Sequence, residues 1–157
     1  MDAAEEAAAL HRQLDDYLAT EGLRRTTQRQ QILDTFIAHG GHLTAEQVVS
    51  LVQDEYAGIG QATIYRTLKL LVDAEILDSH FLTDSVAHYE LHRPGDRHHD
   101  HLVCHTCGRV IEFYDPDIEA RQEALARLHG LRLVGHTHVI HTECLDPERC
   151  PHRQGER

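Results

Sequence analysis

Two pairs of cysteines in the second half of the chain constrain its fold more than any other feature. Cys104 and Cys107 form a Cys-x-x-Cys motif followed by Gly108, a spacing that lets both thiolates reach one tetrahedral ion. Cys144 and Cys150 form a second, wider pair. If all four cysteines bound one structural zinc ion, they would hold the C-terminal segment against the Cys-x-x-Cys motif. The alternatives are free buried cysteines or a redox motif, although no thioredoxin-like βαβ pattern surrounds them.

Histidine is the unusual residue of this chain. There are 15 histidines, most of them after residue 85. In a strand, alternate side chains point to opposite faces, so His98 and Asp100 would face one way and His99 and His101 the other. One short strand can therefore feed two metal sites. Imidazole and carboxylate donors suit Fe(II), Zn(II), Mn(II) or Co(II).

Each of these two sites needs further donors from elsewhere in the chain. Any single candidate could equally be an ordinary surface residue, and for Glu119 alone that reading would normally be preferred. The candidates are the carboxylates Glu90, Glu112 and Glu119 and the imidazoles His42, His88 and His136.

The first half of the chain is predicted to be mainly helical, because apolar residues recur at helical spacing between capping and stop signals. In chain order these signals are Leu10, Leu14, Tyr17 and Leu18, a stop at Gly22, capping boxes at Thr27 with Gln30 and at Thr44 with Gln47, and an amphipathic segment from about Gln61 to Ala74.

A β-hairpin is predicted to follow the helices. Ile76–Leu82 and Ala87–Leu91 are β-prone, and residues 83–85 form a natural turn between them. Helices followed by a hairpin are typical of a winged helix-turn-helix, here assigned to residues 1–92. The Pro-Gly signal within residues 93–97 predicts a hinge linker.

Residues 98–157 are predicted to form a small α/β domain, which makes the whole chain α+β. The expected elements are strands at His101–Val103 and Arg109–Phe113, a helix at Asp117–His129 with Ile118, Leu125 and Leu128 inward, and a β-prone segment at Leu131–His141.

The segment from Gln61 to Ala74 has one face suited to the major groove of DNA. Ala62, Tyr65, Arg66 and Lys69 share that face, away from the inward apolar residues. A merely solvated helix face explains the same pattern equally well. Three arginines upstream could hold backbone phosphates: Arg24, Arg25 and Arg29.

The formal net charge of −11 argues against a general affinity for DNA. Any attraction to phosphate must therefore be local, and bound divalent cations could offset the acidic charge. No apolar run approaches the ~20 residues that a membrane helix needs. The acidic, alanine-rich start does not resemble a signal peptide, so the protein is expected in the cytoplasm and off the membrane.

Three segments together resemble the ferric uptake regulator (Fur) family. Gly60–Leu68 is similar to that family's recognition helix, His98–Phe113 to its metal signature, and Asp117–Gln122 to the helix that follows. The resemblance runs from about Gly22 to Cys150, which is most of the chain.

The resemblance implies a homodimeric repressor of metal-uptake genes, with residues 98–157 as its metal-binding dimerisation domain. This repressor would act on a palindromic AT-rich operator in double-stranded DNA. Its metals would be structural Zn(2+) and a regulatory ion, most simply Fe(2+), with Mn(2+) or Zn(2+) as substitutes. By position, the hinge site matches His42, Glu90, His99, His101 and Glu112, and the second site His98, Asp100, Glu119 and His136. The DNA-binding residues would be Arg24, Arg29, Ala62, Thr63, Tyr65 and Arg66.

Other functions fit the sequence less well. Regulatory donors that are all nitrogen and oxygen favour iron, although they exclude neither zinc nor manganese. A zinc deaminase would carry a His-x-Glu before a Pro-Cys-x-x-Cys motif, whereas Val103 precedes Cys104 here, so no enzyme is expected. A metal buffer or chaperone would explain the histidines but not the basic helix face.

Overall fold

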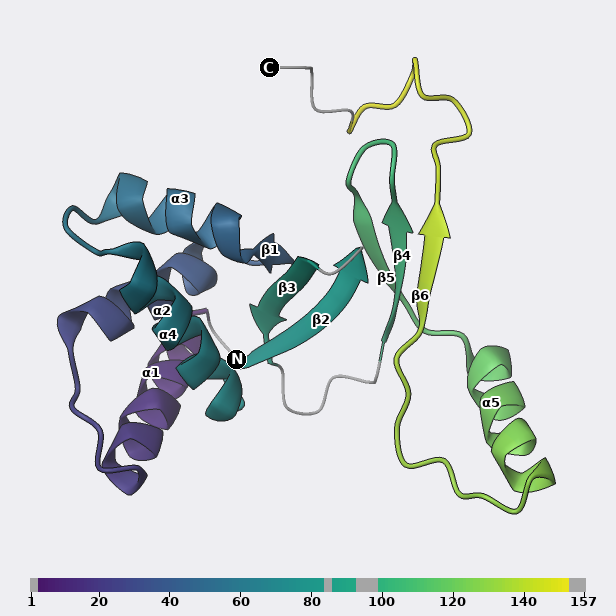
Figure 1. Ribbon diagram of the computed structural model, residues 1–157, viewed down its shortest axis with the longest axis horizontal. Coiled ribbons are helices and arrows are strands. Elements are labelled where there is room, and N and C mark those ends of the chain that lie inside the picture. Colours follow the sequence, from purple (N-terminus) through teal and green to yellow (C-terminus); the bar gives the residue numbers. More distant parts are fainter. Residues whose placement is uncertain (1–2, 84–85, 93–98, 153–157) are drawn as a thin grey trace. The chain divides into compact units, whose positions relative to one another are not determined.

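The computed structural model describes residues 3–83, 86–92 and 99–152 (Figure 1). The chain divides into two compact units, Met1–Pro94 and Gly95–Arg157. Each unit has its own small sheet, with strand order β1-β3-β2 in the first and β5-β4-β6 in the second. Helices and sheets coexist in both units, so the fold is α+β as predicted. Among the described residues, no helix is both long and apolar enough to cross a membrane.

The first unit is helical up to the sheet that ends it. Its elements are α1 (Ala3–Thr20), α2 (Thr27–His39), β1 (Leu43–Thr44), α3 (Ala45–Glu55), α4 (Gln61–Asp73), β2 (Leu77–Thr83) and β3 (Val86–Leu91).

Threonine residues cap the starts of α2 and α3, and one of the two predicted caps needs correction. At α3 the predicted capping box is present: Thr44 and Gln47 exchange side-chain and backbone hydrogen bonds. At α2 the predicted cap at Thr27 is wrong by one residue. Thr26 has the extended backbone of an N-cap and accepts a hydrogen bond from the Arg29 amide, so Thr27 already lies in the first turn.

The core of the first unit is formed where the helices face one another. α1 contributes Leu14 and α2 contributes Phe36, and both side chains are fully buried. Burial of this apolar surface is the main stabilising contribution to a unit of this size. Other fully buried side chains in the same cluster are Ile32, Leu33, Val48, Ile64, Leu71 and Ile76.

The sheet of the first unit is a hairpin with one added strand. β2 and β3 pair antiparallel, with Asp78 opposite Glu90 and His80 opposite His88. β1 was not predicted, because its two residues are too few to show a periodicity; it pairs with β3 through Leu43 opposite Tyr89. Of the predicted turn, residues 84–85 lie outside the described residues.

The second unit is a small sheet with one helix between its second and third strands in the chain. Its elements are β4 (Asp100–Cys104), β5 (Val110–Phe113), α5 (Pro116–Leu128) and β6 (Val139–Thr142). β4 is the central strand, antiparallel to β5 and parallel to β6. Asp115 caps α5 by accepting hydrogen bonds from the amides of Asp117 and Ile118.

Two predictions for this unit are wrong. Leu131–His141 was expected to be a strand, but only its end, from Val139, joins the sheet. Leu125 and Leu128 were expected to face inward, yet they are 59% and 78% exposed. α5 stands apart from the sheet of its own unit (Figure 1), so no residue of α5 is buried within this chain.

Leu14→Ala should destabilise the first unit by about 2–5 kcal/mol, because it opens a cavity in a fully packed core. Leu23→Ala is the control, since Leu23 is 42% exposed and its truncation should change stability by less than about 0.5 kcal/mol. Urea unfolding followed by circular dichroism measures both. Equal losses for the two variants would contradict this description of the core.

Candidate metal centres and nucleic-acid interface

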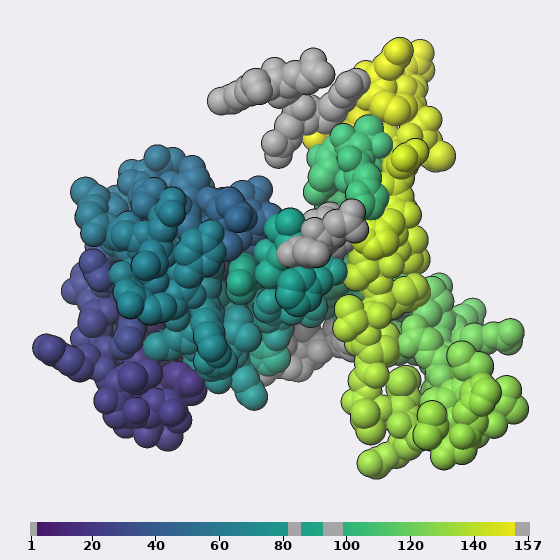
Figure 2. Space-filling view, in the orientation of Figure 1, coloured from purple at the N-terminus to yellow at the C-terminus, as the bar shows by residue number. Residues whose placement is uncertain are grey.

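Three cysteine thiols come together at the end of the β4–β5 hairpin. Ligand atoms of Cys104, Cys107 and Cys144 all lie within 4.8 Å of one another. The Sγ atoms of Cys104 and Cys144 are 3.5 Å apart, close to the roughly 3.8 Å edge of a tetrahedron with Zn–S bonds of about 2.3 Å. Cys144 is held there by its backbone N–H, which donates to Thr106 Oγ1 at 3.1 Å. Figure 2 shows the yellow C-terminal segment beside the green end of this hairpin.

The fourth cysteine adjoins this group. The pKa of the Cys144 thiol is raised to about 12, and the largest cause is its hydrogen bond with Cys150. The pKa of Cys104 is instead lowered to about 6, chiefly because the backbone N–H of Cys107 donates to it. Four neighbouring thiols, one already favouring the thiolate, match the donor chemistry of a closed zinc site.

A second group of donors lies at the start of β4. Asp100 on β4, Glu119 on α5 and His136 have ligand atoms within 4.8 Å of one another. His136 Nε2 is 3.3 Å from Asp100 Oδ1 and 3.3 Å from Glu119 Oε1. The Asp100 side chain is 1% exposed. His98, the remaining residue predicted for this site, lies outside the described residues.

Buried polar atoms in this group lack the hydrogen bonds that burial normally requires. Within the described residues, Glu119 Oε1 and His138 Nδ1 are buried and make no hydrogen bond. Two carboxylates in a buried setting are costly without a cation beside them. The residues therefore fit a divalent ion held by nitrogen and oxygen.

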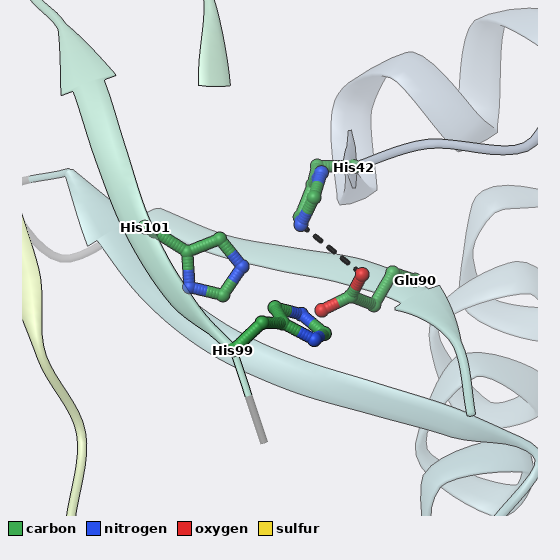
Figure 3. A group of neighbouring side chains, drawn as sticks. All are labelled: His42, Glu90, His99 and His101. Atoms are coloured by element: carbon green, nitrogen blue, oxygen red, sulfur yellow. Dashed lines mark ion pairs between the residues drawn. The ribbon is translucent and has the colours of Figure 1, made fainter. Parts of the chain in front are cut away.

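In the first unit, Glu90 lies between two histidines. His42 Nε2 is 3.1 Å from one Glu90 carboxylate oxygen, and His80 Nε2 is 3.1 Å from the other. Figure 3 draws the first of these contacts as a dashed line. Glu90 is only 8% exposed. The pKa of His80 is raised, mainly by its hydrogen bond to Glu90.

His80 was not predicted to belong to this group. The register that aligns His80 with His88 also places it diagonal to Glu90 on the same face of the hairpin. The strand register, had it been known, would have identified His80 as a neighbour of Glu90. His88, a predicted candidate, has a pKa lowered by burial, which is its largest cause.

In the second unit, the predicted hinge ligands of β4 lie near one another. The rings of His99 and His101, also drawn in Figure 3, have centroids 5.0 Å apart, and His101 is 2% exposed. Glu112 on β5 lies opposite His101 in the sheet register but is itself exposed. Asp100 lies between these histidines in sequence and joins the other donor group, as the strand alternation predicts.

Helix α4 presents the predicted basic face to solvent. Ala62, Tyr65 and Arg66 are exposed, while Ile64 and Leu68 on the opposite face are buried. Lys69 shares the exposed face and forms an ion pair with Asp73 at 2.8 Å. Thr63, also predicted to contact DNA, is half-buried in the first turn.

The upstream arginines have contacts within the unit. The guanidinium of Arg29 donates to the carbonyl of Arg24, and Arg25 Nε is 3.1 Å from Asp15 Oδ1. Arg24 is exposed and Arg29 is half-buried, so Arg29 also fixes the loop before α2.

Comparison with known proteins identifies the family. The model of the ferric uptake regulator family matches residues 20–144. The chain belongs to this family. Its members are DNA-binding, metal-binding transcription repressors, and the chain is accordingly a metal-responsive regulator of the Fur type.

Individual Fur proteins match over most of their length. The ferric uptake regulation protein of Neisseria meningitidis is 44% identical over 130 residues, which are 82% of this chain and 89% of that protein. The Francisella tularensis regulator, solved with iron, has a TM-score of 0.74 at 30% identity and covers 82% of this chain and 96% of its own. The Pseudomonas aeruginosa regulator, solved with manganese, has a TM-score of 0.64 at 33% identity, with coverages of 84% and 98%.

The cysteine pKa values give a prediction for the reduced, metal-free protein. A pH of 7 is above the Cys104 pKa of about 6, so Cys104 is mostly thiolate. Cys144, with a pKa of about 12, stays protonated. Iodoacetamide should therefore modify Cys104 well before Cys144, and lowering the pH to 5 should slow the labelling of Cys104 by about tenfold, because its thiolate fraction falls. Peptide mass spectrometry measures the order, and faster labelling of Cys144 at pH 7 would contradict it.

Proposed function

We propose that this Fur-family chain is an Fe(II)-responsive repressor that binds a palindromic AT-rich operator as a homodimer. The observation that carries the proposal is the separation of donor types. The thiols gather in one group, while histidines and carboxylates form the others. A protein that represses genes in this way acts in the cytoplasm, where its operator lies.

The donor chemistry supports iron as the regulatory ion. Imidazole and carboxylate suit Fe(II), and the cysteines already lie together at the hairpin end. Mn(II) and Zn(II) suit the same donors, so a manganese- or zinc-sensing repressor is the alternative. The four thiols, Cys104, Cys107, Cys144 and Cys150, would hold the structural zinc.

The hinge site would draw its ligands from both units. His42 and Glu90 precede the 93–97 linker, and His99, His101 and Glu112 follow it. The first set has two of the five predicted donors, and the second set has the other three. Ligands from both units would therefore share one ion, whose binding supplies a cross-link of fixed geometry.

This arrangement would couple metal binding to DNA binding. An ion that binds one relative orientation of the units better than others shifts the population towards that orientation. In a dimer, the orientation of each DNA-binding unit sets the separation of the two recognition helices. Only a separation that matches the half-sites of a palindrome allows both helices to bind.

The exposed face of α5 supports dimerisation. Leu125 and Leu128 expose most of their surface, and Leu131 nearby is 65% exposed. Adjacent exposed apolar side chains of this size commonly mark a protein interface. A second copy of the chain, presenting the same face, would bury these leucines.

DNA would be read by α4. Its exposed face, formed by Ala62, Tyr65, Arg66 and Lys69, would enter the major groove, with Thr63 at its edge and Arg24 and Arg29 near the phosphates. The net charge of −11 opposes this encounter. Bound divalent ions reduce that charge, which adds a second reason for metal-dependent binding.

His42→Ala should weaken Fe(II)-dependent operator binding by at least about tenfold, because it removes a predicted hinge ligand. The dimer should remain, since its predicted interface lies in the other unit. A gel shift with Fe(II) titration and sedimentation of the free protein test the two parts. His39→Ala is the matched control, because His39 pairs with Glu55 away from this group. An unchanged metal response in His42→Ala would overturn the hinge ligand.

Arg66→Ala should weaken operator binding by about 1–3 kcal/mol without changing metal affinity, because it removes a base-edge or phosphate contact. Arg12→Ala is the control, since Arg12 is an exposed arginine on α1 rather than on α4. Fluorescence anisotropy with a labelled operator compares the variants. Equal losses for Arg12→Ala and Arg66→Ala would count against α4 as the reading helix.

A further inference from the structure

We propose that His138 is a direct ligand of the second metal ion, together with Asp100, Glu119 and His136. The inference rests on the second site proposed above and deepens it. His138 was not among the residues predicted for any metal site. Its assignment comes from the distances, burial and fixed position of its ring.

The spacing of the donor atoms matches a coordination shell. Around an ion with bonds of about 2.0–2.1 Å, tetrahedral donors lie roughly 3.3–3.4 Å apart. His138 Nδ1 is 3.4 Å from Asp100 Oδ2, and His136 Nε2 is 3.3 Å from Asp100 Oδ1. The contact between His136 and Glu119 is also 3.3 Å. The two histidines approach different oxygens of Asp100, so each contact has the length expected between two ligands of one ion that Asp100 binds through both oxygens.

A simple hydrogen bond from His138 to Asp100 explains the geometry less well. Such bonds have lengths of about 2.7–3.2 Å, shorter than the 3.4 Å observed. Among the described residues, His138 Nδ1 makes no hydrogen bond although the atom is buried. A buried imidazole nitrogen beside a buried carboxylate normally makes that bond. A cation bound by both groups accounts for the longer separation.

The local fold fixes the ring of His138 in this position. The backbone carbonyl of His138 accepts a hydrogen bond from the His101 amide at 3.1 Å, which ties the residue to β4. Phe113 on β5 packs edge-on against the ring, with centroids 6.0 Å apart. His136 and His138 are two residues apart, and each ring has a nitrogen within 3.4 Å of an Asp100 oxygen.

With His98, the predicted ligand that lies outside the described residues, the donor set would have three imidazoles and two carboxylates. It suits a borderline divalent ion such as Fe(II), Zn(II) or Co(II) better than Mg(II) or Ca(II), which favour oxygen alone. A further imidazole therefore shifts this site towards transition metals.

The test uses Co(II), whose visible absorption reports both binding and coordination number. The full chain is loaded with its structural zinc and carries His42→Ala to weaken the hinge site. In this parent, His138→Ala should lower Co(II) affinity at the second site by at least about tenfold and change the absorption spectrum. His129→Ala is the control, because His129 is an exposed histidine at the end of α5. It should bind Co(II) as the parent does.

His138→Asn separates a ligand from a hydrogen-bond donor. The asparagine amide can still donate to Asp100 but is a poor ligand, so its Co(II) affinity should fall as in His138→Ala. Parent-like affinity and spectrum in His138→Asn would overturn the inference. Because the asparagine also keeps a polar group in place, it tests the inference if His138→Ala fails to fold.

Asp100→Asn distinguishes failure of the inference from failure of the site. If Asp100→Asn loses Co(II) while both His138 variants bind like the parent, His138 is not a ligand but the second site stands. If Asp100→Asn also binds like the parent, the second site itself is wrong, and the role of His138 falls with it.

Discussion

The alternation of side chains along β4 is the constraint on which the rest of the second unit depends. Successive residues of this central strand face opposite ways, so Asp100 joins Glu119 and His136 while the His101 side chain faces away from them. At its end the same strand places Cys104 in the thiol cluster. Backbone hydrogen bonds to β5 and β6 hold all three positions in register. One strand thus contributes residues to three candidate metal sites.

Buried charge explains how bound ions would stabilise this fold. Glu90 in the first unit and Asp100 in the second are buried carboxylates. Each lies between two imidazoles of its own unit. Burial of an anion is costly unless a cation or several hydrogen bonds compensate it. The acidic net charge adds a general repulsion from DNA. A bound divalent ion would reduce both the cost of the buried carboxylates and the repulsion from DNA. Metal occupancy and DNA affinity are therefore expected to rise together.

Much of this structure could be predicted from local sequence signals, and the exceptions have physical reasons. Helix caps, the hairpin and the alternation of β4 are encoded by neighbouring residues. β1 is too short to show a pattern. The exposed leucines of α5 were predicted to be buried, because an apolar stripe on a helix does not show whether the same chain or another one covers it. His80 and His138 were missed because their partners come from strand register and from an irregular segment. The DNA-binding and hinge residues remain predictions.

The central claim is that metal binding and operator binding are coupled through the hinge ligands. Thermodynamic linkage makes this coupling reciprocal: if Fe(II) strengthens operator binding, the operator must strengthen Fe(II) binding by the same factor. Anaerobic Fe(II) titration of the protein, with and without a saturating operator duplex, measures that factor directly. We expect tighter Fe(II) binding with the duplex by at least about fivefold, and no such gain in His42→Ala. Equal Fe(II) affinity with and without the duplex would contradict the coupling.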